Sequence, residues 1–291
     1  MKIAIHGRTF NNDAIPYIQE MFDTLKSRES EILVYKNFSV FLDKVGIKYS
    51  TANIYSHHEE LENTDFLFSI GGDGTFLESV SFAGPQQIPL LGINTGRLGF
   101  LATTPREKIL QAIDSIYKHT YKFEERTLIH LDSDIDLFNG VNFALNEFAI
   151  LKRDISSMIV VHTYINGEYL NSYWADGLII STPTGSTGYS LSCGGPLVMP
   201  STNNFIISPV SPHNLNVRPM IVPDSSILSF EIEARNKNFL ISLDSRSKSV
   251  PVRTKLTVRR EKFKAKIVEL EGYNYFQTLR NKLNWGLDLR N

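Results

Sequence analysis

The chain has 291 residues, enough for two domains or one large domain with a substantial core. Its 30 basic and 31 acidic residues nearly cancel, which argues against binding to nucleic acid or membranes through overall charge. The single cysteine, Cys193, excludes an internal disulfide, and we see neither a leader-like start nor an apolar run of about 20 residues, so we expect a soluble cytoplasmic protein.

Short apolar runs alternate with helical patterns in the first part of the chain. Four of these runs are expected to be strands: 2–6, 32–35, 65–70 and 89–93. Apolar residues at helical spacing from Ile15 to Leu25 predict a helix that lays one face on a sheet. A weaker helix is expected around Val40, Phe41 and Val45. This alternation predicts an α/β domain, with a Rossmann-like parallel sheet covered by helices.

A glycine-rich turn, Gly71–Thr75, follows the third of these strands. Such a turn from strand to helix aims backbone N–H groups at one point, where a phosphate can bind. Asp73 stands in its middle and suggests two functions, holding a metal or accepting a proton. The alternative is that Asp73 closes a local Asx-turn and the glycines make a tight bend. The strand exits at Gly71 and at 94–96 are expected to form two walls of one crevice, because ligands of such sheets bind beyond the carboxyl ends of the strands.

The pattern changes after the next helix. Thr104–Glu107 reads as a capping box with proline at the first helical position, opening a helix that buries its apolar face between 109 and 117. From about residue 122 to 268 the chain reads as successive short strands without a convincing helix. One hairpin is expected at 159–170 across Asn166-Gly167, and another pair from 227–232 and 239–243.

This change predicts two domains. Residues 1–115 are expected to form the α/β domain with the glycine turn, and residues 116–269 a β-rich, β-sandwich-like domain. The segment 270–291, which looks helical from 273 to 283, is expected to pack back on the first domain.

Two polar segments of the β-rich part are candidates for binding. Hydroxyls and glycines are so dense from Thr182 to Pro196 that this segment is not expected to be core, although a long polar loop is the plainer interpretation. Asn146 and Glu147 lie side by side on an expected strand, and alternation sends their side chains to opposite faces. An amide can pair with a base edge or ribose, and a carboxylate can accept from ribose hydroxyls. The alternative without a ligand is that Asn146 and Glu147 are simply an exposed polar pair at the end of a strand.

Taken together and in order, these motifs resemble those of the NAD kinase family. The matching segments are 71–75, 94–101, 146–147, 176–177, 182–196, 211–213 and 216–219, which span roughly residues 65 to 250. The glycine–aspartate turn alone is shared with lipid kinases and phosphofructokinases, whereas the segment 182–189 is specific.

The resemblance implies transfer of a phosphoryl group from ATP, or from polyphosphate, to the 2′-hydroxyl of the adenosine ribose of NAD, giving NADP. It implies NAD and ATP as substrates, Mg²⁺ with ATP, and a homo-oligomer, either dimer or tetramer. Nucleic acid and membranes are not expected as partners. Alternatives are a lipid kinase of the diacylglycerol or sphingosine type, or a catalytically silent NAD(P)-binding sensor. A nucleic-acid module has little support, because the basic cluster Arg259–Lys264 reads as a solvated edge strand.

The resemblance also assigns functions to individual residues. Asp73 is the expected catalytic base, and the turn amides at Gly72 and Gly74 would hold phosphate oxygens. The expected NAD and nucleotide contacts are Asn146, Glu147, Asp176, Thr184, Thr187, Gly188, Tyr189, Ser190, Leu191 and Ser192. No metal ligand is assigned.

Two departures from the family pattern affect this region. Gly188 replaces a frequent alanine, which is expected to add room. Where the family commonly has Leu-Asp-Gly-Gln, this chain has Leu243-Asp244-Ser245-Arg246, so a cation stands where an amide is usual. Arg246 is expected either to meet a phosphate or to face solvent, and Asp244 and Arg246 are kept as further candidate contacts of the ligand.

Overall fold

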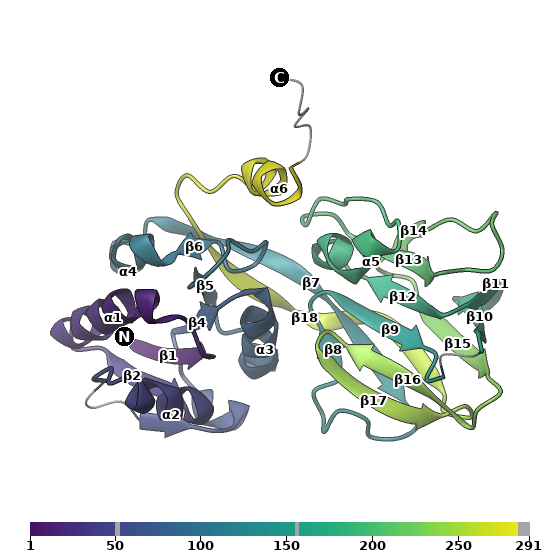
Figure 1. Cartoon of the computed structure of the whole chain (residues 1–291), viewed down its shortest axis with the longest axis horizontal. Helices are drawn as coiled ribbons and strands as arrows, with labels where there is room; N and C mark the ends of the chain where they lie inside the picture. The colour runs from purple at the N-terminus through teal and green to yellow at the C-terminus, as the bar shows by residue number, and fades with distance from the viewer. Residues whose placement is uncertain (50–52, 155–156, 285–291) are drawn as a thin grey trace. The chain divides into compact units, whose positions relative to one another are not determined.

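The fold is described from a computed structural model, over residues 1–49, 53–154 and 157–284. It divides into two compact units, which are described separately (Figure 1). Unit 1 comprises Met1–Glu125 and Ala265–Asn291, and unit 2 comprises Arg126–Lys264. The chain leaves unit 1 within β7 (Tyr121–Ser133) and returns within β18 (Leu256–Leu270). Domain limits at 115 and 269 stay a prediction.

Unit 1 contains the expected parallel sheet, with strand order β18-β5-β4-β1-β2-β3. Its strands are β1 (Lys2–Gly7), β2 (Glu31–Tyr35), β3 (Asn53–Tyr55), β4 (Phe66–Gly71), β5 (Leu90–Asn94), the C-terminal part of β18, and the short β6 (Thr104–Pro105) beside β5. Sequence analysis missed β3 because its only deeply buried side chain is Tyr55, within a polar stretch.

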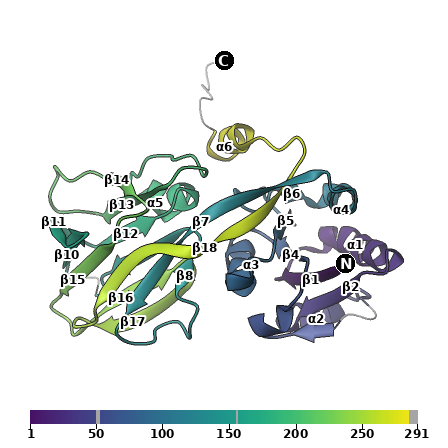
Figure 2. The ribbon, with the colours of Figure 1, turned by 180° about the vertical axis from the view of Figure 1, so that it is seen from behind.

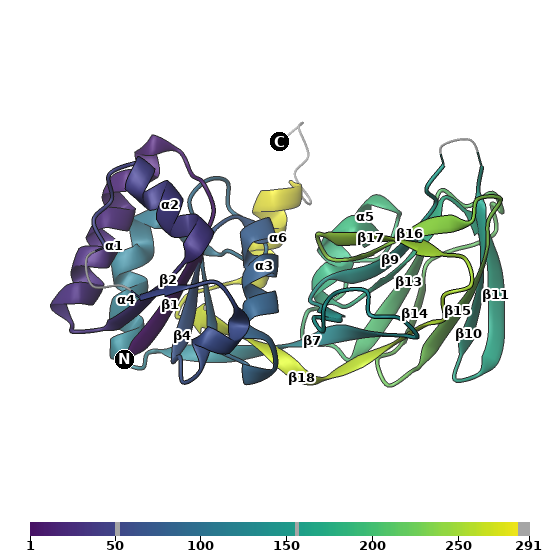
Figure 3. The same cartoon turned by 90° about the horizontal axis from the view of Figure 1, so that it is seen from below.

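Helices cover both faces of this sheet. Its helices are α1 (Ile15–Ser27), α2 (Lys36–Lys44), α3 (Asp73–Ala83), α4 (Ile109–Tyr117) and α6 (Tyr275–Leu283), with 3-10 turns η1 (Asn12–Ala14), η2 (His58–Leu61), η3 (Gly84–Gln86) and η4 (Arg106–Lys108). Figure 3 shows α3 across the sheet from α1 and α4. Successive side chains of a strand point to opposite faces of the sheet, which explains this placement. Phe68 of β4 packs in the core with α1 and α4, whereas the following residue, Ser69, accepts a hydrogen bond from Ser79 of α3 at 2.9 Å.

One local expectation for the helices of unit 1 is confirmed and one is wrong. The expected helix around Val40 and Phe41 forms as α2, with Val45 as its C-cap, and its buried residues are Phe38, Ser39 and Leu42, while Val40 is 66% exposed. The capping box does not form, because Thr104 pairs with Ile93 in β6 and a 3-10 turn precedes α4. Pairing with the sheet thus overrides the local helix-start signal.

Unit 2 is a sandwich of two largely antiparallel sheets. One sheet has the order β11-β10-β15-β18, and β18 also pairs with β7, as seen from behind in Figure 2. The other has the order β14-β13-β12-β9-β16-β17. Apart from β7 and β18, the elements of unit 2 are β8 (Phe143–Ala144), β9 (Glu147–Leu151), β10 (Ile159–Ile165), β11 (Glu168–Ala175), β12 (Gly177–Ser181), β13 (Asn204–Val210), β14 (Met220–Pro223), β15 (Leu228–Glu233), β16 (Asn238–Leu243), β17 (Arg246–Pro251), η5 (Thr184–Thr187) and α5 (Tyr189–Ser192). A hydrophobic core with side chains from both sheets lies between them.

The strand pairing of unit 2 only partly matches expectation. The hairpin β10–β11 forms across Asn166 and Gly167, both with positive φ, and is confirmed. The expected pairing of β15 with β16 is wrong, because the two strands lie in different sheets. The short helix α5 was not expected. The basic cluster lies in β18 after residues 256–258, which pair with β15, and its place on an edge strand stays a prediction. Among the described residues, no helix is long and apolar enough to span a bilayer.

Candidate active site

The carboxylate of Asp73 is held by the loop that follows the neighbouring strand. Asp73 is the first residue of α3, directly after β4. Its Oδ2 accepts the N–H of Phe100 at 2.9 Å, and its Oδ1 accepts those of Leu101 at 3.0 Å and Ala102 at 3.1 Å. The exits of β4 and β5 therefore meet, as parallel neighbours of one sheet should.

These contacts decide between the two interpretations of Asp73. A local Asx-turn would direct the carboxylate to backbone two residues on, whereas it bonds residues 27 to 29 positions away. Each carboxylate oxygen can accept about two hydrogen bonds. Since Oδ2 accepts only one of these three N–H groups, it keeps acceptor capacity for a proton. The geometry therefore favours chemistry over a bend.

The turn around Asp73 also leaves space for a ligand. Among the described residues, no atom outside their chain neighbours comes within 4 Å of a methyl group built on Gly72 or Gly74. Their amides belong to the N-terminal turn of α3, where backbone N–H groups lack helical partners and the helix dipole favours an anion. Opposite them, Asn94 shapes the β5 exit by accepting from the Gly96 N–H at 2.8 Å and donating to the Arg97 carbonyl at 2.6 Å.

A polar cluster that reaches from the buried His6 to the exposed Arg8 joins α3 to the sheet. His6 of β1 bonds the Tyr55 hydroxyl at 3.1 Å and faces Glu78 of α3, which receives the Arg8 Nε–H at 2.8 Å. Burial alone would raise the pKa of Glu78, but its contacts with His6 and Arg8 outweigh it and lower that pKa. Sequence analysis missed this cluster, because its members come from three separate parts of the sequence, at residues 6–8, 55 and 78.

In unit 2, Asn146 and Glu147 present their side chains to one glycine. A methyl group built on Gly188 would lie 3.0 Å from Glu147 Oε2 and 3.5 Å from Asn146 Nδ2. The expectation of opposite faces is therefore wrong, because β9 begins only at Glu147 and strand alternation does not extend to Asn146. Among the described residues, no hydrogen-bond partner reaches the buried Asn146 Oδ1 or Glu147 Oε2, so both can meet a ligand.

The protonation of Glu147 is unusual. Burial, and then the negative charge of Asp244, raise the pKa of Glu147 to about 8, against the opposing hydrogen bond from the Tyr189 N–H. Glu147 therefore carries a proton at neutral pH, so it can donate a hydrogen bond as well as accept one.

The hydroxyl-rich segment that follows β12 is largely internal. Thr182 bonds the Leu145 carbonyl at 2.5 Å, and Thr184 accepts from Arg126 at 3.2 Å. Ser186 bonds Val198, and Ser190 bonds the Ser208 hydroxyl at 2.9 Å; all four of these hydroxyl residues are buried. The expectation that this segment cannot be core is wrong. Its hydroxyls are inside because backbone and side-chain partners satisfy them.

The exposed part of this segment is shorter than expected. Tyr189 is 39% exposed, Ser192 is exposed, and Thr187, Gly188 and Leu191 are half-buried. These five positions remain available for a ligand. Thr184 and Ser190, by contrast, turn their hydroxyls to protein partners.

Three charged residues predicted as ligand contacts meet protein groups. Asp176 pairs with the Lys152 ammonium at 2.7 Å. Asp244 accepts three backbone N–H groups, and Arg246 donates to two backbone carbonyls. Their contact with a ligand stays a prediction. No signal in the sequence pointed to Arg126, which holds Thr184.

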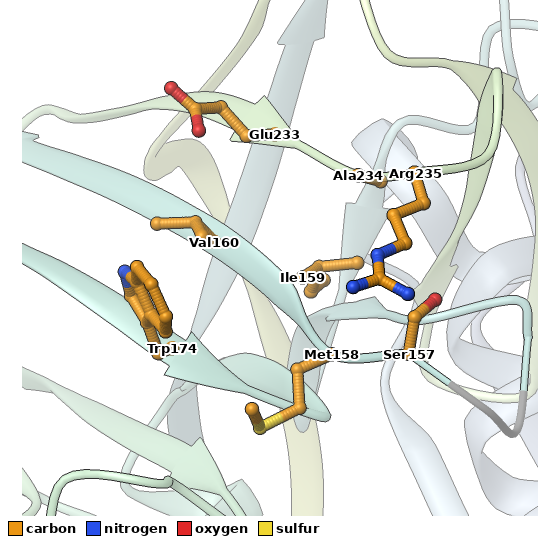
Figure 4. Close-up of a pocket in the computed structure, with 8 residues that line it drawn as sticks. All are labelled: Ser157, Met158, Ile159, Val160, Trp174, Glu233, Ala234 and Arg235. Carbon is orange, nitrogen blue, oxygen red and sulfur yellow. The ribbon is translucent and has the colours of Figure 1, made fainter.

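The pocket drawn in Figure 4 lies apart from these residues. It has a volume of about 500 Å³ and lies at the ends of β10, β11 and β15, where Met158, Trp174 and Arg235 line it. None of the predicted site residues is among its lining. Each unit therefore has its own candidate polar grouping, around Asp73 in unit 1 and around Asn146-Glu147 in unit 2.

Comparisons with known proteins give matches along the whole chain. Two protein-family models match the chain, the ATP-NAD kinase N-terminal domain over residues 3–121 and the ATP-NAD kinase C-terminal domain over residues 145–270. A relative from Cytophaga hutchinsonii named NAD kinase is 60% identical over 292 residues and covers 100% of both chains.

Two solved structures share the fold. Yeast NADH kinase complexed with NADH has a TM-score of 0.88 at 23% identity, covering 100% of this chain and 89% of that chain. An NAD kinase from Archaeoglobus fulgidus in complex with ATP has a TM-score of 0.73 at 26% identity, covering 98% of each.

Proposed function

This chain belongs to the NAD kinase family of phosphotransferases, and we propose that it transfers the terminal phosphoryl group of ATP, or of polyphosphate, to the 2′-hydroxyl of the adenosine ribose of NAD. The product is NADP. The observation that carries the proposal is the Asp73 carboxylate, fixed by three N–H groups with capacity left on Oδ2.

Asp73 serves as the general base of this reaction. A ribose hydroxyl is a poor nucleophile, and removal of its proton in the transition state accelerates attack on phosphorus. Oδ2 takes the proton while the N–H groups of Phe100, Leu101 and Ala102 hold the carboxylate in position. The phosphoryl group moves from the donor oxygen to the ribose oxygen, and the donor leaves as ADP or a shortened polyphosphate.

The glycine turn binds the phosphate donor. The open space beside Gly72 and Gly74 admits phosphate oxygens to the N–H groups at the start of α3. Among the described residues, no three His, Cys, Asp or Glu side chains are grouped to hold a metal. Mg²⁺ that enters with ATP needs no such grouping, because this ion binds mainly through phosphate oxygens and water, with few protein ligands. When bound, Mg²⁺ offsets the charge of the phosphates.

Asn146 and Glu147 bind the adenosine part of NAD. Their free buried oxygens provide an acceptor on Asn146 and, because Glu147 is protonated at neutral pH, both a donor and an acceptor there. We place Thr187, Gly188, Tyr189, Leu191 and Ser192 beside the adenosine, with Thr184 and Ser190 shaping the segment from inside. Asp176 lies toward the nicotinamide end.

The test is formation of NADP by the purified full-length protein. Parallel assays contain ATP or polyphosphate, with NAD or NADH, in the presence and absence of Mg²⁺. We expect NADP from NAD with at least one donor. Absence of NADP with every donor contradicts the proposal. Phosphorylation of diacylglycerol or sphingosine instead would identify a lipid kinase, and NADP binding without turnover a sensor.

We also propose that the protein acts in the cytoplasm as a homo-oligomer, a dimer or tetramer. Sedimentation velocity at micromolar concentration measures the mass directly. A single species at the monomer mass of 33.0 kDa contradicts the oligomer.

A further inference from the structure

We propose that Asp244 is the positioning residue for the Asn146-Glu147 pair. Its carboxylate fixes the backbone that carries both side chains and so aims them at the nucleoside. The inference rests on the proposed function, because that function assigns NAD to Asn146 and Glu147.

Asp244 lies at the turn between β16 and β17, beside the segment that leads into β9. Its Oδ2 accepts the N–H of Leu145 at 2.9 Å, and its Oδ1 accepts those of Asn146 at 2.8 Å and Glu147 at 3.1 Å. Its own N–H donates to the Glu147 carbonyl at 3.0 Å. Four hydrogen bonds therefore join this single residue to a segment nearly 100 positions away.

Three successive N–H groups that converge on one point form an anion-binding concavity. Here the anion is a side chain of the chain itself, so Asp244 fills the place that a phosphate oxygen would otherwise take. Asp73 is held in the same way by residues 100–102, but its Oδ2 lies at an open turn. Asp244 is half-buried, and its own N–H also bonds the segment that its carboxylate holds, which suits a support.

Arg246 completes the support from the same hairpin. Its guanidinium donates to the Val141 carbonyl at 2.5 Å and to the Phe143 carbonyl, and it lies 5.6 Å from the ring centre of Phe138. It also offsets the charge of Asp244. The cation that replaces the family's usual glutamine thus meets two backbone carbonyls and lies near the charge of Asp244.

The opposite side of the Asn146 segment is held by the turn after β12. The Thr182 N–H donates to the Asn146 carbonyl at 2.8 Å, and Thr182 Oγ1 bonds the Leu145 carbonyl at 2.5 Å. Protein groups from both sides thus occupy the backbone of this segment. The Asn146 amide and the Glu147 carboxyl remain to meet the nucleoside.

Asp244 acts on Glu147 through its charge as well as through its hydrogen bonds. The groups that face Glu147 are the Asp244 carboxylate, the Tyr189 N–H and phenol, and the Cys193 thiol, while Arg246 faces Asp244. A negative charge at Asp244 disfavours a second one at Glu147, so the pair retains a proton at neutral pH. Asp244 therefore fixes the position of Glu147 and, after burial, adds to the rise in its pKa.

The experiment measures NAD binding to the full-length protein by calorimetry between pH 6 and 9, for wild type and Asp244→Asn. The matched control is Asp224→Asn, a buried aspartate of unit 2 that accepts from Arg260 at 2.9 Å. We expect Asp244→Asn to weaken NAD binding at least tenfold at pH 7 and to leave the KM for ATP unchanged. We also expect the pH inflection of NAD affinity to move to lower pH, because the repelling charge is gone. Asp224→Asn should change neither.

A folded Asp244→Asn protein with wild-type NAD affinity and an unmoved inflection overturns the proposal. A uniform loss of affinity with the inflection in place shows a merely structural function and overturns it as well. If the variant does not fold, amide exchange on the ligand-free wild type decides, since the N–H groups of residues 145–147 should exchange slowly and fast exchange overturns the proposal. Wild type that fails to bind NAD contradicts the proposed function instead.

Discussion

The carboxylate of Asp73 lies directly against the backbone of Gly99. A methyl group at Gly99 would overlap Oδ1 of Asp73 and force the carboxylate or the loop to move. Gly99→Ala is therefore expected to lower kcat at least tenfold, because the loop that donates three N–H groups to Asp73 is displaced. Steady-state kinetics measure the effect. Gly96→Ala in the same loop is the matched control, with free space around its methyl group, and should keep wild-type kcat. Equal activity of both variants contradicts this reading of the loop.

Removing the base should affect turnover more than binding. Asp73→Asn leaves a side chain that cannot accept the ribose proton, and general base catalysis contributes typically about 10²–10⁴-fold. We expect kcat to fall by about that factor with the KM for NAD within a few-fold. Thermal unfolding of the same sample shows whether the amide also weakens the contact with residues 100–102. A variant that retains more than a tenth of wild-type kcat argues for another base.

Two glycines of the hydroxyl-rich segment should respond differently to alanine. A methyl group at Gly185 would overlap the carbonyl of Asn146, whereas one at Gly188 would lie 3.0 Å from Glu147 Oε2. Gly185→Ala is thus expected to displace the Asn146 backbone, raise the KM for NAD at least tenfold and lower the melting temperature. Gly188→Ala needs only a small shift of the Glu147 side chain, so its KM for NAD should rise less than threefold. The reverse order of the two effects would contradict the described packing.

Glu147 should make stability depend on pH. Its pKa in the folded protein is raised to about 8 by burial and then by Asp244, from an ordinary value near 4.5. The folded state therefore binds an extra proton between those values, and the stabilisation present below about pH 4.5 is lost as pH rises to about 8. Gln stays neutral at every pH. We therefore expect the free energy of unfolding of Glu147→Gln to rise relative to that of wild type as the pH increases across this window, by on the order of a few kcal/mol.

Chemical denaturation at several pH values measures this difference. Glu168→Gln, at an exposed position of β11, is the control and should follow wild type throughout. A constant difference between Glu147→Gln and wild type from pH 5 to 8 would show that Glu147 is ionised in the folded protein at neutral pH.

Local patterns in the sequence were sufficient for the fold class and for the chemistry of the main motifs. Apolar runs alternating with helical spacing predicted the parallel sheet of unit 1, and Asn166-Gly167 predicted the β10–β11 hairpin. These features depend on residues close together in the chain, where periodicity and turn preferences act directly. The order of the motifs around Asp73, Asn146 and Thr182 was likewise sufficient to identify the family.

Only the tertiary structure decided what each polar side chain contacts. Asp73 meets residues 27 to 29 positions away, and Asp244 meets residues 97 to 99 positions away, which no local pattern encodes. The same holds for the division of β15 and β16 between two sheets, and for the hydroxyls of Thr182 and Ser190 that turn inward. Hydrogen-bond satisfaction is a property of packed segments, so a residue type can suggest a function while its partners determine whether it acts on a ligand or on the fold.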